Sequence, residues 1–339
     1  MIDSYNRKID YLRLSVTDRC NLRCIYCMPE KGIKLLDKRE LLTFGEILKV
    51  VKILSGLGIK KIRFTGGEPL LRDNIIELIN DIKNIAGIED LAITTNGILL
   101  GRFLKDLHKA GIRRINISMD SLDPEKYRMI TRGGDLQEVL EVIEDSMEMG
   151  FESIKINTVL TGLLDRKDSL DLIKFALEKP VSIRFIEMMP VSGLDTIECG
   201  SNLYRSTGKA RINMESILRS MGEFGKVRSV KESERYGPAI YYKIDGGKGR
   251  IGFIVNESKI CFYCNRIRLT PKGTLRYCLF SERELDIKRK LRDDGFDDES
   301  IRAMLKGFIK KKPKDRNYNI SCKRENEFKI DSSMNEIGG

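Results

Sequence analysis

The feature that most limits how this chain can fold is a regular alternation of short β-branched runs with amphipathic helical segments. Alternation of this kind predicts βαβ units and a parallel sheet. The six units are two fewer than a closed barrel needs, so we predict a partial (β/α)6 TIM-type barrel or a doubly wound sheet. In either architecture, active-site groups lie beyond the carboxyl ends of the strands. The six runs end at Val16, Thr65, Thr95, Ser118, Leu160 and Met188.

Helical patterns fill the intervals between these runs. The first spans residues 44–58, where Thr43 and Glu46 have capping-box spacing and Gly56 and Gly58 are stop signals. Further helices are predicted at residues 74–86, 101–110, 135–150 and 169–177.

From about Pro190 the alternation stops, which divides the chain into a barrel core at residues 1–190 and a C-terminal region at residues 191–339. The C-terminal region is predicted to be mixed α+β. It contains a short helical pattern near residues 213–221, strand-like runs at 241–245 and 249–255, a charged helical segment from Glu282 to Lys312, and a polar tail.

The composition favours a cytoplasmic protein that binds metal through its cysteines. No apolar run reaches the roughly 18 to 20 residues that cross a bilayer, and the N-terminus lacks the apolar segment of a signal peptide. We therefore expect no membrane contact. Thiols stay reduced in the cytoplasm, so the clustering of six of the eight cysteines indicates metal binding or redox chemistry rather than disulfides.

The charge balance is basic. An excess of 61 Lys and Arg over 50 Asp and Glu gives +11, which suits nucleic acid, a membrane surface or a small polyanion. Trp is absent, and no basic stretch is interleaved with aromatics in a pattern that would stack bases. The densest basic stretch, residues 310–324, is typical of a solvated tail. We therefore expect no nucleic-acid binding.

The first cysteine group is CxxxCxxC, made by Cys20, Cys24 and Cys27 directly after the first predicted strand. Three thiolates can ligate three irons of a four-iron cluster and leave the last iron open to another ligand. A structural zinc site needs four protein ligands, and the one histidine, His108, falls on a predicted helix. The spacing therefore favours an iron–sulfur cluster over zinc.

The other strand ends carry residues suited to a charged, nucleotide-like ligand. Gly66-Gly67-Glu68-Pro69 follows the second strand, and its glycines allow close backbone approach while its carboxylate suits an ammonium group. TTNG ends the third strand, the fourth ends in Ser118-Met119-Asp120, and the sixth runs into Met189. Each motif alone is also compatible with ordinary turn chemistry.

The segments CNLRCIYC, FTGGEPLLR, TTNG and ISMD, in this order, resemble those of the radical S-adenosylmethionine (SAM) superfamily. The resemblance implies a 4Fe–4S cluster on Cys20, Cys24 and Cys27, whose open iron holds the amino and carboxylate groups of SAM. Reductive cleavage of SAM would give methionine and a 5′-deoxyadenosyl radical that removes hydrogen from a substrate. The SAM-binding residues implied by the resemblance are Tyr26, Gly67, Ser118 and Met189.

The second cysteine group contains Cys261 and Cys264, spaced CxxC, and Cys278 farther along. A zinc ribbon would need a fourth ligand, and Cys322 lies in a polar basic tail where a free thiol is expected. A second 4Fe–4S cluster with an open iron fits three cysteines better. Its open position could bind substrate directly.

Basic residues within predicted strands indicate an anionic substrate. Arg266 and Arg268 alternate on the strand predicted between the second cysteines, so both face one side. Guanidinium groups bind phosphate oxygens bidentately. Buried charge is costly unless it is paired or faces a polar cavity, although any single residue could be salt-bridged or solvent-facing. A triphosphate in the barrel mouth would explain these two arginines together with Arg13, Arg63, Lys155 and Arg184.

With the radical-SAM motifs, CNRIRLTPKGTLRYCLF and the terminal MNEIGG closely resemble the GTP 3′,8-cyclase family of molybdenum cofactor biosynthesis, over essentially the whole chain. The resemblance implies that the second cluster holds the guanine of GTP and that the radical removes the ribose 3′ hydrogen. The carbon radical would attack C8, giving (8S)-3′,8-cyclo-7,8-dihydroguanosine 5′-triphosphate. GTP contacts are implied for Arg13, Arg63, Thr94, Lys155, Arg184, Arg266 and Arg268.

The same resemblance implies that the tail ending in Gly338 and Gly339 reaches toward the active site. It also implies a homodimer, an external electron donor, and a downstream cyclic pyranopterin monophosphate synthase that takes the product. One stretch, residues 191–210, does not match the family pattern and is interpreted as a loop insertion, with its Cys199 a free or buried thiol.

Two alternatives stay open at this point. Another radical SAM enzyme with an auxiliary cluster, such as a peptide-modifying maturase, would share the first motifs. A zinc-stabilised binding protein would use both cysteine groups without catalysis. Iron with sulfide, rather than stoichiometric zinc, would exclude the second alternative.

Overall fold

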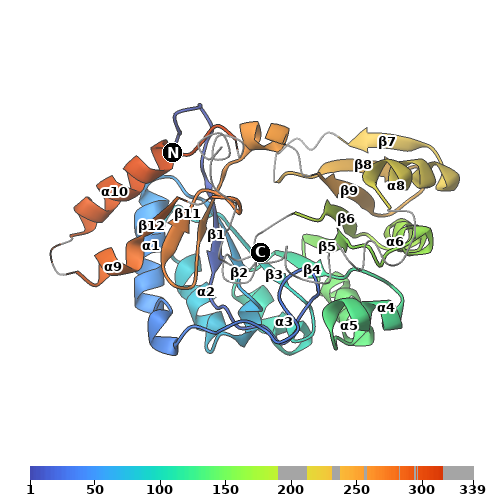
Figure 1. The fold of residues 1–339 in the computed structure, drawn as a ribbon, viewed down its shortest axis with the longest axis horizontal. Coiled ribbons are helices and arrows are strands. Elements are labelled where there is room, and N and C mark those ends of the chain that lie inside the picture. The colour runs from blue at the N-terminus through green and yellow to red at the C-terminus, as the bar shows by residue number, and fades with distance from the viewer. Residues whose placement is uncertain are drawn as a thin grey trace.

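The computed structural model describes residues 1–189, 212–230, 237–255, 258–281, 283–293, 295 and 297–315. Its centre is one curved, open sheet (Figure 1). The strands are β1 (Tyr11–Ser15), β2 (Lys61–Thr65), β3 (Asp90–Thr95), β4 (Arg114–Ser118), β5 (Ser153–Leu160), β6 (Ser182–Glu187), β7 (Val227–Val230), β8 (Ile240–Ile244), β9 (Arg250–Ile254), β10 (Arg266–Leu269), β11 (Thr274–Arg276) and β12 (Glu284–Asp286). Their order across the sheet is β12-β11-β10-β1-β2-β3-β4-β5-β6-β9-β8-β7.

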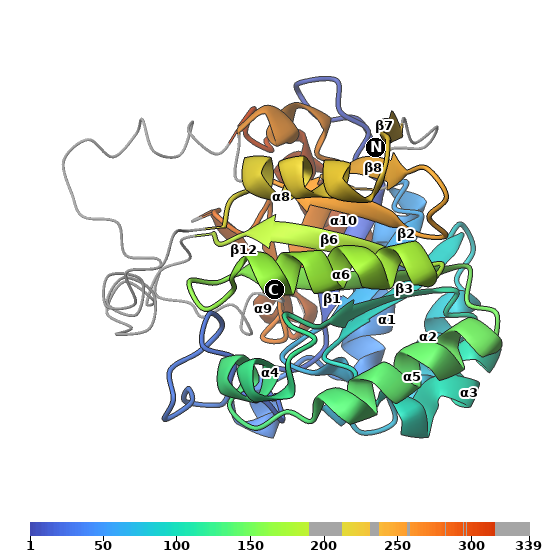
Figure 2. The same cartoon turned by 90° about the vertical axis from the view of Figure 1, so that its right-hand side faces the viewer.

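The helices lie along the outer face of this sheet (Figures 1 and 2). A doubly wound sheet carries helices on both faces, so the partial barrel is the architecture that the chain adopts. The helices are α1 (Phe44–Gly56), α2 (Ile75–Lys83), α3 (Leu100–Lys109), α4 (Pro124–Thr131), α5 (Leu136–Glu148), α6 (Arg166–Glu178), α8 (Met214–Met221), α9 (Ile287–Leu291) and α10 (Asp298–Lys310). Among the described helices, none is long and apolar enough to cross a bilayer.

The six predicted strands and the helices predicted between them are present. The capping box predicted for α1 forms, because the Thr43 hydroxyl accepts from the Glu46 N–H at 3.2 Å and the Glu46 carboxylate accepts from the Thr43 N–H at 2.7 Å. The prediction missed α4, which begins at Pro124 and whose cap, Asp123, accepts from the Lys126 N–H at 3.0 Å. Asp-Pro was the available start signal for this short helix.

The C-terminal region extends both edges of the barrel sheet. Strand β10 pairs in parallel with β1, and β9 pairs in parallel with β6. Antiparallel partners, β11 and β8, occupy their other edges, so these two strands do not close the barrel by pairing with each other. The domain boundary predicted after residue 190 stays a prediction, because residues 190–211 lie outside the described ranges.

The charged segment predicted to be helical from Glu282 to Lys312 is only partly so. It contains β12, α9 and α10. Helix α10 has its own N-cap, Asp297, whose carboxylate accepts from the Ser300 N–H at 2.8 Å. An N-cap of this kind starts a new helix within a uniformly charged stretch. The charge content of the stretch alone does not show where that helix begins.

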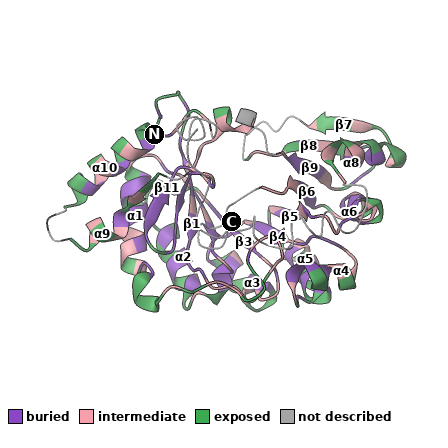
Figure 3. Cartoon of the chain, viewed as in Figure 1, coloured by how far each residue is buried: buried purple, intermediate pink, exposed green. Residues whose placement is uncertain are grey.

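Burial follows the layers of the fold. The strands β1 to β6 and the inner faces of the helices are mostly buried, whereas the outer helix faces and the edge strand β7 are largely exposed (Figure 3). Phe64 of β2 and Phe185 of β6 are among the largest fully buried side chains. Several buried strand residues are charged or polar instead, including Asn116, Lys155 and Arg184. Their positions define the site described next.

Candidate active site

The loop after β1 carries Cys20, Cys24 and Cys27, each partly buried. The N–H of Cys27 donates to the carbonyl of Cys24 at 2.9 Å, which makes a tight turn between the last two cysteines. Helix α4 holds the loop, because the N–H of Ile25 donates to the carbonyl of Ile130 at 2.9 Å. The helix that the sequence pattern missed therefore anchors the first cysteine group.

The GGEP segment after β2 packs against the cysteine loop. A Cβ at Gly67 would stand 2.3 Å from the carbonyl oxygen of Arg19, so the close approach predicted at these glycines is made to the neighbouring loop. The Glu68 carboxylate is fully buried and accepts from the Thr95 hydroxyl at 2.9 Å and the Asn96 N–H at 2.8 Å. Burial raises the pKa of Glu68 to about 7.

The ends of β3 and β4 reach the same loop. The Asn96 amide nitrogen lies 3.8 Å from the Cys20 sulfur, and the Tyr26 hydroxyl donates to Asp120 at 2.9 Å. Asp120 also accepts from the Val159 N–H at 2.7 Å. Burial raises the pKa of Asp120 to about 6. The loop that carries the first cysteine group is therefore surrounded by the ends of β2, β3 and β4 and by the buried carboxyl groups of Glu68 and Asp120.

The second cysteine group lies beside β10 and β11. Cys261 is in a 3-10 turn (Ser258–Tyr263), and the N–H of Cys264 donates to its carbonyl at 3.2 Å. Cys278 follows β11. Burial disfavours the Cys264 thiolate, but the positive charges of Lys312 and Arg266 outweigh burial and lower the pKa of this thiol to about 6.

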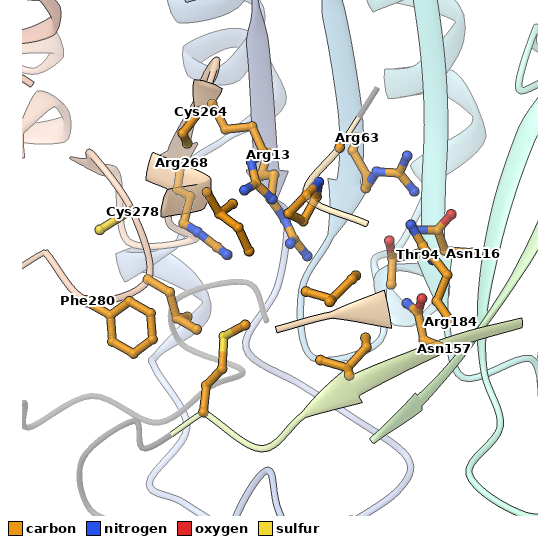
Figure 4. A pocket seen from close by; sticks show the side chains of 18 of the residues that line it. Arg13, Arg63, Thr94, Asn116, Asn157, Arg184, Cys264, Arg268, Cys278 and Phe280 are labelled. Atoms are coloured by element: carbon orange, nitrogen blue, oxygen red, sulfur yellow. The ribbon is translucent and has the colours of Figure 1, made fainter. Parts of the chain in front are cut away.

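A cavity of about 300 Å³ on the concave side of the sheet lies against the second cysteine group and reaches the first cysteine loop at Tyr26. Its wall contains Tyr26 from the first cysteine loop and all three cysteines of the second group. Figure 4 shows Cys264 and Cys278 at one end of the cavity and Asn157 and Arg184 at the other. The volume is at the lower end of the range for ligand pockets.

Arginines form one side of this cavity because three strands are in register. Arg13 of β1 lies between Arg268 of β10 and Arg63 of β2. Burial, together with the charge of Arg266, lowers the pKa of Arg268 to about 10. Like charges held together in a buried wall are unfavourable alone and are stabilised by an anion. The wall therefore has the chemistry of an anion site.

From β2 to β6 the wall of the cavity presents hydrogen-bonding atoms that find no partner in the described part of the chain. Buried polar atoms are normally hydrogen-bonded, so a group of them around one cavity indicates a ligand. The asparagines were missed by sequence reasoning. Asn116 lies two residues before Ser118, and Asn157 two residues after Lys155, so the same-face rule for strands could have found them. The atoms are Arg63 Nη1, Thr94 Oγ1, Asn116 Oδ1, Asn157 Oδ1 and Arg184 Nε.

The structure brings most of the predicted site residues to this cavity. Lys155 is not in the cavity wall, but it is buried, pairs in register with Asn116, and places its ammonium 5.6 Å from the ring centre of Tyr241. Gly67 lies beneath the first cysteine loop. Cys199, Cys322, Gly338 and Gly339 lie outside the described residues. Besides the three cysteines of the second group, the predicted residues that line the cavity are Tyr26, Ser118, Met189, Arg13, Arg63, Thr94, Arg184, Arg266 and Arg268.

Each cysteine group supplies three thiols, and a 4Fe–4S cluster binds its thiolates through separate irons. A structural zinc site would need a fourth protein ligand. Cys27 and Cys20 are close enough to Cys24 to add to the effect of burial in raising the pKa of its thiol.

Comparison with known proteins agrees with this geometry. Residues 14–176 match the family model of the radical SAM superfamily, and residues 181–318 match the model called Molybdenum Cofactor Synthesis C. A GTP 3′,8-cyclase of Alkaliphilus oremlandii is 43% identical over 100% of both chains. Another, from Thermodesulfovibrio yellowstonii, is 47% identical over 92% of this chain and 94% of its own. The chain belongs to the GTP 3′,8-cyclase family.

Membership of the GTP 3′,8-cyclase family makes the chain a radical SAM enzyme, and this superfamily implies a 4Fe–4S cluster and SAM. Among solved structures, Streptococcus suis SuiB bound to S-adenosylmethionine has a TM-score of 0.60 and 14% identity, covering 90% of this chain and 68% of that chain. At this identity the likeness shows a common fold only. It agrees with the partial barrel and its C-terminal extension.

Proposed function

We propose that the cavity binds SAM beside the first cysteine group and GTP beside the second, and that the chain converts GTP to 3′,8-cyclo-GTP for molybdenum cofactor biosynthesis. The observation that carries this proposal is a single cavity that is lined by the second cysteine group, reaches the first cysteine loop at Tyr26 and has an arginine-lined wall. Full-length identity to GTP 3′,8-cyclases supports the same substrate.

The SAM end is assigned to Tyr26, Gly67, Ser118 and Met189. Tyr26 is held by its hydrogen bond to Asp120, which presents the ring to the cavity in one orientation. When bound on Cys20, Cys24 and Cys27, the cluster supplies the electron that cleaves SAM to a 5′-deoxyadenosyl radical. The anchoring of this loop by α4 keeps the three thiols in place for that cluster.

The GTP end is assigned to the basic residues and to a second 4Fe–4S cluster on Cys261, Cys264 and Cys278. Guanidinium groups of the β10–β1–β2 wall bind phosphate oxygens bidentately and offset their charge. The oxygens of Asn116 and Asn157 accept hydrogen bonds from hydroxyl or N–H groups of the substrates. The other proposed GTP contacts are Thr94, Lys155 and Arg184.

Three partners belong to this proposal. An external one-electron donor is needed because each cleavage of SAM consumes an electron. A cyclic pyranopterin monophosphate synthase would take the product. A second copy of the chain would complete a homodimer.

A peptide-modifying radical SAM enzyme is the alternative that shares the fold. SuiB bound to precursor peptide SuiA gives a TM-score of 0.55 at 14% identity. The cyclases of Alkaliphilus and Thermodesulfovibrio are far closer in sequence over nearly the whole chain. The arginine wall also favours a phosphate-bearing substrate over a peptide.

The decisive experiment is anaerobic incubation of the reconstituted protein with SAM, dithionite and GTP, followed by mass spectrometry of the nucleosides and nucleotides. We expect 5′-deoxyadenosine together with an isomer of GTP, and neither when GTP is replaced by ATP. If 5′-deoxyadenosine forms while GTP stays intact, the substrate assignment is wrong. If neither product forms in protein that holds both clusters, the radical reaction itself is excluded.

A further inference from the structure

A buried lysine lies against the second cysteine group and has no role in the proposed reaction. Lys312 follows α10 and is 3% exposed. Its ammonium donates to the carbonyls of Arg266 at 2.5 Å and Tyr277 at 2.9 Å, and lies 3.5 Å from the Cys264 sulfur. These three contacts reach both sides of the cysteine group, because Arg266 follows Cys264 and Tyr277 precedes Cys278.

The protein fixes the backbone of Lys312 from a distant part of the chain. The Arg7 guanidinium donates to the carbonyl of Lys312 at 3.2 Å and to that of Pro313 at 2.6 Å. It also donates to the carbonyl of Cys261 at 2.8 Å and pairs with Asp3 at 2.6 Å. Arg7 therefore ties the segment that carries Lys312 directly to the cysteine turn.

An aromatic stack holds the same segment from α10. The rings of Tyr277 and Phe308 are nearly parallel, with centres 4.0 Å apart. Lys312 is therefore held in place two residues after the end of α10, a helix that packs on Tyr277 beside Cys278.

The charge of Lys312 has no carboxylate partner among the described residues. An ammonium buried against neutral carbonyls is costly, and the nearby guanidinium of Arg266 adds repulsion. The anionic groups within reach are the thiolates of the cysteine group. Three thiolates exceed the positive charge of an oxidised iron–sulfide core, so a loaded site is negative and becomes more negative when it takes up one electron.

We propose that Lys312 is a positioning residue of the second cluster: it holds the Cys264 sulfur in place and, by its charge, favours the reduced form of the cluster. The inference rests on the proposed function, which places a cluster on Cys261, Cys264 and Cys278. The redox step is the gain of one electron by that cluster, supplied in the test by dithionite.

The experiment compares Lys312→Met, Lys312→Arg and Lys311→Met in the full-length protein, reconstituted anaerobically with iron and sulfide. Lys311 is the exposed neighbour, so its variant removes the same charge from the surface. Iron content is measured first. The potential of the second cluster is then followed by electron paramagnetic resonance during a redox titration, in the holoenzyme and in a Cys24→Ser background that removes the first cluster.

We expect Lys312→Met to lower the reduced-to-oxidised ratio at a fixed potential at least tenfold, which is a shift of about 59 mV toward negative values for one electron. Lys312→Arg should shift the ratio less, and Lys311→Met should not shift it. Loss of the second cluster in Lys312→Met but not in Lys312→Arg would also support the proposal, because the cationic contact would then be required for assembly.

Equal potentials and iron contents in Lys312→Met and Lys311→Met would overturn the inference. Equal defects in Lys312→Met and Lys312→Arg would overturn it as well, since packing and not charge would then matter. If the unsubstituted protein holds no cluster on the second cysteines, the failure lies in the proposed function instead.

Discussion

The two cysteine groups offer the same number of thiols but have opposite electrostatic surroundings. Glu68 and Asp120, both buried, lie around the first group. Burial is the main cause that raises the pKa of Cys24, and neighbouring negative charges raise it further. Lys312 and Arg266 lie around the second group and lower the pKa of Cys264. The difference supports our proposal that SAM, a cation, binds at the first group and GTP, an anion, at the second.

Separate cysteine substitutions give the largest test of this comparison. Cys24→Ser should abolish both 5′-deoxyadenosine and cyclised nucleotide, whereas Cys278→Ser should abolish only the nucleotide, because the two ligand sets are separate. Each variant should lose about half of the iron. Cys322→Ser, outside both groups, is the control. If Cys278→Ser loses 5′-deoxyadenosine as completely as Cys24→Ser does, the two cysteine groups do not act separately.

The cationic wall can be removed without touching a thiol. Charge-assisted hydrogen bonds contribute about 1.5 to 3 kcal/mol each, so Arg266→Ala and Arg268→Ala should each weaken GTP binding about 10- to 100-fold. Equilibrium binding of GTP and of SAM measures the effect, and SAM affinity should stay unchanged. Arg102→Ala on the exposed side of α3 is the control. Unchanged GTP affinity would show that these two arginines do not bind GTP.

The hydrogen-bonding side of the cavity should contribute less. Removing a single neutral hydrogen bond costs about 1 kcal/mol, so Asn116→Ala should weaken GTP binding about fivefold. The exposed Asn84→Ala serves as a matched control. If SAM affinity falls and GTP affinity does not, Asn116 contacts SAM and not GTP, and the SAM end of the cavity extends as far as Asn116.

The acidic surroundings of the first group should appear in the pH dependence of stability. The folded protein raises the pKa of Glu68 from 4.5 to about 7, so between these values it keeps a proton that the unfolded chain releases. This contribution to stability is full below pH 4.5 and is lost as the pH rises through about 7. Thermal melts of the cluster-free chain should therefore show a steeper decline over this range than melts of Glu68→Gln. Exposed Glu77→Gln should behave as the parent does.

The barrel core was predictable because its signals are local. Runs such as residues 11–16 and 153–160 alternate with helical patterns, and period, length and caps are properties of neighbouring residues. The edges were not predictable in the same way. The strand runs of the C-terminal region, such as residues 249–255, do not indicate which edge of the sheet they join. That choice, made by the pairing of β10 with β1, places the second cysteines at the cavity.

The sequence by itself determined the two cysteine triplets, the motifs at the strand ends and the basic strand positions, since each is a matter of residue type at short spacing. Tertiary structure alone decided that Glu68 faces Thr95 and Asn96, that Asn116 and Asn157 share the cavity, and that Arg7 reaches Lys312 over a sequence separation of 305. These contacts depend on how the sheet curves and where the chain returns. Burial makes these contacts stronger than they would be in water. Charges and polar groups removed from water must find partners in the fold or in a ligand.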